Sequence, residues 1–245
     1  MNDLHAVLWI ARKDLLQESR SKAVTVATVF FSAVTLGVLA FAFGENPLLM
    51  REGAMGALWV ALAFAGVISA AQSWQADLED GALEALLAWP VPRAAVYLGK
   101  LLANWGLMTV LGFVLLPIAG GLYGADIGGG GAASGGADVG GGGEAAPALV
   151  VAVLLGVIAA GTLGFALIAV FYAGLTANLR ARESLLPVLM FPVVVPILLA
   201  AVRASNALVG SGDLDLAWAW LRLLVGFDLV YAVVCLVLFR FVVEA

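Results

Sequence analysis

Long runs of apolar residues, separated by short polar segments, dominate the chain. Each run is about as long as the ~20 residues, or longer, that an α-helix needs to cross the ~30 Å hydrocarbon core of a bilayer. The runs are continuous rather than alternating, which argues against the strands of a membrane barrel. The pattern predicts an all-α membrane protein with six transmembrane helices in a single domain. The expected spans are residues 23–43, 53–72, 101–123, 148–175, 185–202 and 223–243.

A shorter, amphipathic pattern precedes the first span. Apolar residues recur there at helical spacing, at Leu4, Leu8, Ala11 and Leu15. Val7 and Leu16 lie beside these positions, and Arg12, Lys13, Glu18 and Arg20 lie elsewhere in residues 3–22, which indicates a helix lying in the membrane interface. A simple extension of the first span is the alternative.

Composition narrows the class of protein. Of the 245 residues, 63% are hydrophobic and 12% are charged, whereas soluble domains have about 45–50% apolar and about 25% charged residues. A soluble or a disordered chain is therefore excluded, and the loops leave no room for a catalytic domain.

With Cys235 and His5 as the only cysteine and histidine, no disulfide framework or metal site is expected within the chain. The net charge of −5 gives no reason to expect nucleic acid as a partner.

The positions of lysine and arginine predict the orientation in the cell (cytoplasmic or inner) membrane. If the N-terminus is cytoplasmic, the inner segments contain nine of these residues and the outer segments contain Arg51, Arg203 and Arg222. This bias favours both termini in the cytoplasm. The outer connection 124–147 is rich in glycine and is expected to be a flexible loop. It is not a phosphate-binding loop, because no strand precedes it and the chain has no G-x-x-x-x-G-K-[ST] motif.

The cytoplasmic connection between the second and third spans carries the most informative polar pattern. Acidic residues precede Gly81, Pro90 follows, and residues 82–89 between them fit a short amphipathic helix. Such a helix suits docking to a soluble partner, or resting on the lipid interface. Physical chemistry alone does not separate these two interpretations. The residues of the pattern are Glu79, Asp80, Gly81, Leu83, Glu84, Leu86, Leu87 and Pro90, followed by Gly99 and Lys100.

This pattern resembles the cytoplasmic signature of ABC-2-type transporter permeases, and most closely that of the B-subunit family of haem exporters in cytochrome c maturation. The resemblance extends to residues 41–47, 57–68, 178–205 and 227–245, and so covers nearly the whole chain. The glycine-rich loop departs from the family, in which this connection is usually short.

The resemblance implies a permease that works as a homodimer with two copies of a separate ATPase subunit. ATP would then bind to that partner, haem would be a possible cargo rather than a cofactor of this chain, and the chain itself would not be an enzyme. The family is associated with haem delivery, or with ATP-driven release of a haem-loaded chaperone, together with other membrane proteins of cytochrome c maturation. The helix 81–89 would be the coupling helix, with Glu79, Asp80 and Glu84 near the ATPase.

Two features inside the spans are candidates for transport or gating. Asp228 lies within the last apolar run, where a carboxylate is costly; a structural hydrogen bond to a neighbouring span is the alternative. Pro187, Pro192 and Pro196 interrupt the hydrogen bonds of the fifth span and are expected to kink it, although prolines in membrane helices also serve packing.

Other functions fit the sequence less well. An ABC-2-type permease for a lipid, drug or glycan would share the same architecture, because the cargo depends on a cavity shape that the sequence does not display. A secondary transporter or an intramembrane enzyme needs more ionisable groups at mid-membrane than Asp228 alone.

Overall fold

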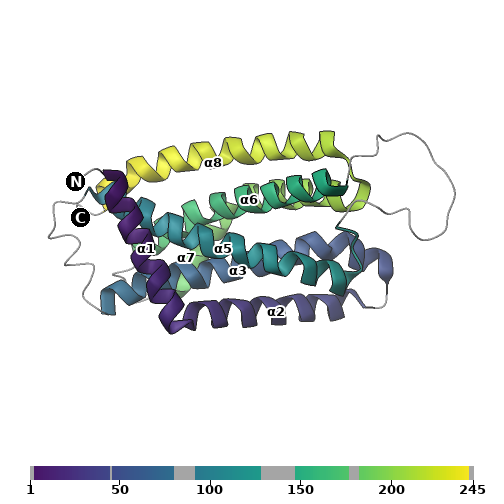
Figure 1. Cartoon of the computed structure of the whole chain (residues 1–245), viewed down its shortest axis with the longest axis horizontal. Coiled ribbons are helices and arrows are strands. Elements are labelled where there is room, and N and C mark those ends of the chain that lie inside the picture. Colours follow the sequence, from purple (N-terminus) through teal and green to yellow (C-terminus); the bar gives the residue numbers. More distant parts are fainter. Residues whose placement is uncertain (1–2, 45, 80–91, 128–146, 177–181, 243–245) are drawn as a thin grey trace.

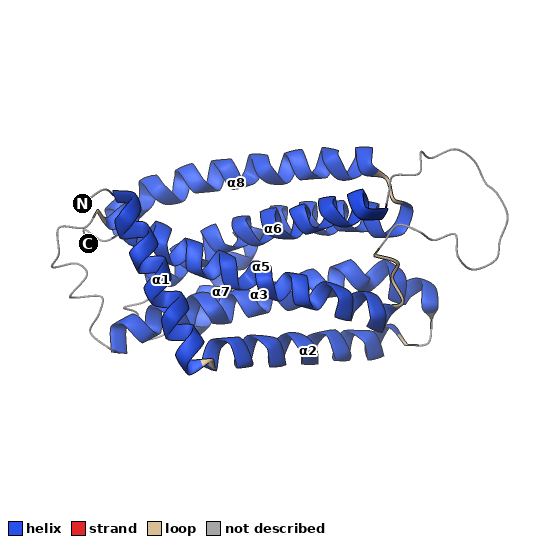
Figure 2. Cartoon of the chain, in the orientation of Figure 1, coloured by secondary structure: helices blue, strands red, loops and turns tan. Residues whose placement is uncertain are grey.

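The computed structural model describes residues 3–44, 46–79, 92–127, 147–176 and 182–242. Within these ranges every regular element is helical (Figure 2). The elements are α1 (Asp3–Ser21), α2 (Ala23–Phe43), α3 (Pro47–Glu79), α5 (Arg93–Tyr123), α6 (Pro147–Thr176), α7 (Arg182–Asn206), the π-helix η1 (Ala207–Ser211) and α8 (Leu214–Val242).

Most of these helices run along the long axis of the molecule and form an elongated bundle (Figure 1). Helices α2, α3, α5, α6, α7 and α8 are each long and apolar enough to cross a membrane. The six-span, all-α prediction is therefore confirmed. Helix α2 has the bounds that the apolar pattern indicated, whereas α3, α5 and α8 extend well beyond the expected spans.

Capping residues explain where two of the longer helices begin. The side-chain oxygen of Asn46 accepts hydrogen bonds from the backbone N–H groups of Leu48 (3.1 Å) and Leu49 (3.4 Å), and Pro47 occupies the first helical position. At the start of α8, the Asp213 carboxylate accepts from the N–H of Leu216 at 3.0 Å. The apolar runs place these starts too late in the chain, because polar and charged residues separate each cap from its run.

The N-terminal amphipathic segment forms a separate helix, as predicted. Lys22 adopts a left-handed backbone conformation, with φ of 53°, so α1 ends before α2 begins and the chain changes direction there. Helix α1 crosses one end of the bundle (Figure 1) and packs mainly on α5. It is not an extension of the first span.

Helices α3 and α6 form the centre of the bundle, while α2 and α8 lie at its two edges (Figure 2). In the most apolar part of each helix, 67% of the residues of α3 and 61% of those of α6 are buried, against 17% in both α2 and α8. The exposed residues of α2 and α8 are large and apolar, for example Phe30, Val38 and Leu229. Such a surface is suited to lipid rather than to water.

Candidate functional site

Most of the predicted ATPase-coupling residues lie outside the described part of the chain. These are Asp80, Gly81, Leu83, Glu84, Leu86, Leu87 and Pro90. Glu79 is the last residue of α3, and the description does not extend to its side chain. The structure does describe both helices that flank this segment, which are α3 before it and α5 after it.

The facing ends of α3 and α5 are joined by a buried ion pair. The Lys100 ammonium of α5 lies 2.7 Å from the Asp77 carboxylate of α3, and both residues are 1% exposed. The same ammonium donates to the carbonyl oxygen (3.0 Å) and to the hydroxyl (3.1 Å) of Ser73, and it lies 5.0 Å from the centre of the Trp74 ring. These contacts compensate the desolvation of the buried lysine.

Helix α1 adds two more charges to this pair. The Lys13 ammonium donates a hydrogen bond to the Asp77 carboxylate and lies 3.1 Å from the Asp14 carboxylate. Asp14 in turn lies 3.4 Å from the Lys100 ammonium. Burial lowers the pKa of Lys13, but the hydrogen bond and charge of Asp77 and the charge of Asp14 outweigh it and raise the pKa above its ordinary value. Lys13, Asp14, Asp77 and Lys100, hereafter the ion cluster, thus hold three helices together with balanced charge.

Asp228 is buried between α8, α6 and α7. The residue is 6% exposed, and its Oδ1 atom has no hydrogen-bond partner among the described residues. The carboxylate fills the space left by Gly164 of α6, since a Cβ atom at that position would lie 2.0 Å from Oδ1 and 2.9 Å from Ile197 of α7. The Oδ1 atom of Asp228 therefore does not form, within the described part of the chain, the structural hydrogen bond that was the alternative to a transport role.

The three predicted gating prolines lie inside α7. The helix is continuous from Arg182 to Asn206 through Pro187, Pro192 and Pro196. The Tyr231 hydroxyl of α8 donates to the carbonyl oxygen of Val193 at 3.0 Å, between the second and third prolines. A side chain from a neighbouring helix thus bonds to the backbone where prolines weaken the helical ladder.

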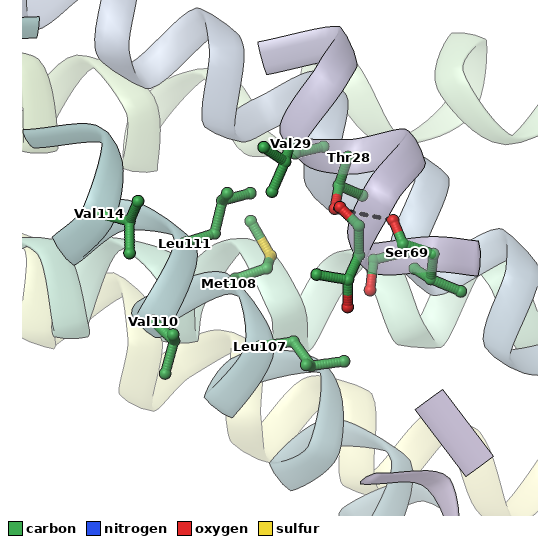
Figure 3. A pocket seen from close by; sticks show the side chains of 11 residues that line it. Thr28, Val29, Ser69, Leu107, Met108, Val110, Leu111 and Val114 are labelled. Atoms are coloured by element: carbon green, nitrogen blue, oxygen red, sulfur yellow. Dashed lines mark hydrogen bonds between the residues drawn. The ribbon is translucent and has the colours of Figure 1, made fainter. Parts of the chain in front are cut away.

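An apolar cavity of about 160 Å³ lies between α2, α3 and α5. Val29, Met108 and Leu111 contribute to its walls, and the hydroxyl groups of Thr28 and Ser69 lie at one end (Figure 3). The volume is below the roughly 300–1,000 Å³ of typical small-molecule sites. This cavity does not enclose a whole drug-sized ligand.

The six apolar helices and the buried charges at one end define a multi-pass α-helical membrane protein. The family model described as CcmB protein matches residues 5–132 and 144–244. The chain belongs to this family.

Relatives from several bacteria are similar to most of the chain. Heme exporter protein B of Pseudomonas aeruginosa is 29% identical over 214 residues, which cover 84% of this chain and 85% of the relative. The protein of the same name from Haemophilus influenzae is 28% identical over 206 residues, covering 84% and 82%. That of Rhodobacter capsulatus is 30% identical over 175 residues, covering 69% and 68%.

The sequence pattern did not predict the ion cluster. It indicates an interfacial helix that contains Lys13 and a group of acidic residues before Gly81, but no contact between the two. A usable signal exists nonetheless: Asp77 and Lys100 flank the connection between two successive spans, so both lie on the same side of the membrane, where opposite charges can pair. The separation of Asp77 and Lys100 in the sequence does not indicate where α1 packs.

Proposed function

We propose that the chain is the membrane-spanning permease subunit of an ABC transporter that handles haem for cytochrome c maturation. The observation that carries this proposal is the match of the CcmB family model to both halves of the chain. Relatives named Heme exporter protein B and six membrane-spanning helices support it. The cargo step is either haem export or release of a haem-loaded chaperone.

The energy source in this proposal is a separate ATPase subunit. The sequence contains no Walker A motif, so ATP hydrolysis needs a second polypeptide. The coupling contact is the segment from Glu79 to Pro90, with Glu79, Asp80 and Glu84 near the ATPase. The ion cluster at its flanks supports this assignment, because it fixes the two helix ends between which the segment is held.

The working unit contains two copies of the permease and two of the ATPase. The small cavity between α2, α3 and α5 supports a dimer, because a path wide enough for a large amphipathic cargo then forms between chains rather than within one. Both termini face the cytoplasm, in agreement with the bias of lysine and arginine. Thiol labelling of cysteines introduced at His5 and at Asp126, in a Cys235→Ser background, tests this orientation from the two sides of the membrane.

Asp228 is the proposed transport residue inside the membrane, and the prolines of α7 are the proposed gating positions. A buried carboxylate whose Oδ1 has no hydrogen-bond partner among the described residues marks a site where a charge or a proton is used rather than a packing contact. Gly164 makes room for this carboxylate, and Tyr231 holds the backbone of α7 beside Pro192 and Pro196.

Deletion of the gene tests the proposed function. We expect holo c-type cytochromes to disappear on a haem-stained gel while b-type cytochromes remain, and expression of the tagged chain to restore them. The tagged chain should also capture its ATPase from solubilised membranes. Normal c-type cytochromes in the deletion strain, with loss of another exported amphipathic molecule, would assign the permease to a different cargo.

A further inference from the structure

The cavity between α2, α3 and α5 is a groove that opens on the lipid-facing side of the bundle. Helices α2 and α5 both pack on α3 but meet each other at few points. The floor of the groove is buried and includes Ala65, Met108 and Leu111 (Figure 3). Val29 and Val110 on its rims are 40% and 62% exposed. Since both rim residues lie in membrane-spanning helices, the groove is reached from the bilayer.

The end of the groove nearer α1 is polar and has unused hydrogen-bonding capacity. Thr25, Thr28 and Ser69 line it there. The Ser69 hydroxyl accepts a hydrogen bond from the Asn104 amide at 2.8 Å and donates to no acceptor among the described residues. Asn104 is 2% exposed, and its Oδ1 atom has no partner among those residues. A ligand in the groove can therefore be bound by polar groups at this end and by apolar walls along the rest.

Positive charge lies at the same end. Lys22 precedes Thr25 and Val29 at the helical spacing that places all three on one side of α2. Lys22 and Arg20, in the last turn of α1, are exposed and form no ion pair within the described part of the chain. The acid of this junction, Glu18, is 8% exposed, and its carboxylate accepts hydrogen bonds from the N–H and hydroxyl of Thr25. The exposed charge beside the groove is thus basic.

A bilayer supplies an occupant with the same order of groups. Apolar walls that face a void lose their dispersion contacts, and water does not replace them, because an apolar cavity gives it too few hydrogen bonds. A phospholipid has an acyl chain, an ester region with carbonyl oxygens and its accompanying water, and a phosphate. Part of one acyl chain fills a cavity of about 160 Å³, while the rest of the chain continues into the bilayer.

We propose that this groove binds one anionic phospholipid, with an acyl chain in the groove, its ester region at Ser69 and its phosphate at Lys22 and Arg20. The Ser69 hydroxyl donates to an ester carbonyl, and the lipid fills the gap between the edge helix α2 and α5. The site goes beyond the proposed function, because it depends on neither the cargo nor the ATPase. Each basic residue near an anionic lipid contributes about fivefold in affinity.

Lipid titration of the purified, delipidated full-length chain tests the headgroup site. Native mass spectrometry resolves the adducts formed with phosphatidylglycerol and with phosphatidylcholine that has the same acyl chains. Lys22→Asn removes the charge at a left-handed position that asparagine tolerates, and Lys22→Arg keeps the charge. The matched control is Arg12→Gln, because Arg12 is also exposed on α1 but stacks on Trp9, three helical turns from Lys22.

We expect the first phosphatidylglycerol to bind at least about fivefold more tightly than phosphatidylcholine, and Lys22→Asn to lower this preference about fivefold. Lys22→Arg and Arg12→Gln should retain it. Equal binding of the two lipids by the unaltered chain overturns the proposal. Equal losses in Lys22→Asn and Arg12→Gln also overturn it, because they would reflect a diffuse attraction to the basic surface of α1.

Substitutions in the groove test the position of the acyl chain. Ala65→Leu fills the floor and should weaken the binding of both lipids about five- to 150-fold, the cost of overpacking one site. Val114→Trp makes the same test from the exposed rim, and its matched control is Ile118→Trp, because Val114 and Ile118 are both 49% exposed and only Val114 lines the cavity. Unchanged binding in Val114→Trp contradicts the proposal. Disulfide formation between two chains carrying Val110→Cys would show that a second copy covers the groove, and would overturn it as well.

Discussion

Substitution of Gly161 by alanine tests the packing at the centre of the bundle. Gly161 of α6 faces the indole of Trp59 of α3, which is 2% exposed. An added Cβ atom would lie 2.3 Å, 2.9 Å and 3.1 Å from three atoms of the ring. The ring cannot move freely, because its N–H group donates to the Ser205 hydroxyl at 3.0 Å. The helices must separate at this point, and the shift of the ring also breaks this hydrogen bond.

The expected cost follows from these contacts. Overpacking of a tight core costs about 1–3 kcal/mol, and loss of the Trp59–Ser205 hydrogen bond adds about 0.5–1.5 kcal/mol. Alanine's higher helix propensity offsets about 0.8–1 kcal/mol of this cost. We therefore expect Gly161→Ala to lower the free energy of unfolding by about 1–3 kcal/mol. Gly156→Ala, in the same helix with nothing within 4 Å, should leave it unchanged or raise it.

The chain contains its own probe for this measurement. Cys235 is its only cysteine and is 4% exposed, so a thiol-reactive dye reports unfolding in detergent. Titration with denaturing detergent gives the free-energy difference between Gly161→Ala and Gly156→Ala. If Gly161→Ala proves as stable as Gly156→Ala, the Trp59–Gly161 contact is not part of the folded bundle.

Three further substitutions have definite expected outcomes. Lys100→Met should lower the free energy of unfolding by about 3–5 kcal/mol, because it leaves Asp77 buried with only Lys13 as its ion-pair partner. The thiol-dye titration measures this loss, and an unchanged free energy of unfolding would contradict the buried ion pair. Asp228→Asn should keep or raise that stability while holo-cytochrome yield falls, because it removes a buried carboxylate whose Oδ1 has no hydrogen-bond partner among the described residues; full yield would exclude Asp228 from transport. Tyr123→Phe should cost about 0.5–1.5 kcal/mol, since its buried hydroxyl donates to the Leu36 carbonyl at 2.8 Å, and no loss of stability would show that this bond contributes nothing.

Local patterns in the sequence predicted the elements of the fold but not all of their ends. Continuous apolar runs were enough for six spans, because a bilayer fixes both the length and the composition of a spanning helix. The start of α3 was missed, because Arg51 and Glu52 interrupt the apolar run, although Asn46 and Pro47 are both typical of helix starts. The start of α8 was missed, because Arg222 was taken as the end of a loop when it lies inside the helix.

The tertiary contacts of the site could not be predicted in the same way. The spacing of residues in α1 predicts an amphipathic helix, yet nothing in that spacing says that it packs on Gly99 of α5. Likewise, the sequence identifies Asp228 as an unusual charge in a span but not Gly164 as the residue that makes room for it. Such contacts depend on how helices pack in three dimensions, and pattern periodicity carries little information about that.

The most direct test of the central claim is to measure haem transfer by the reconstituted complex. Membrane vesicles or nanodiscs that contain this chain and its ATPase would be supplied with haem, ATP and the haem chaperone, and released haem-loaded chaperone would be quantified by its absorbance. The account predicts release that requires both ATP and this chain. Equal release in the absence of the chain, or without ATP, would contradict it.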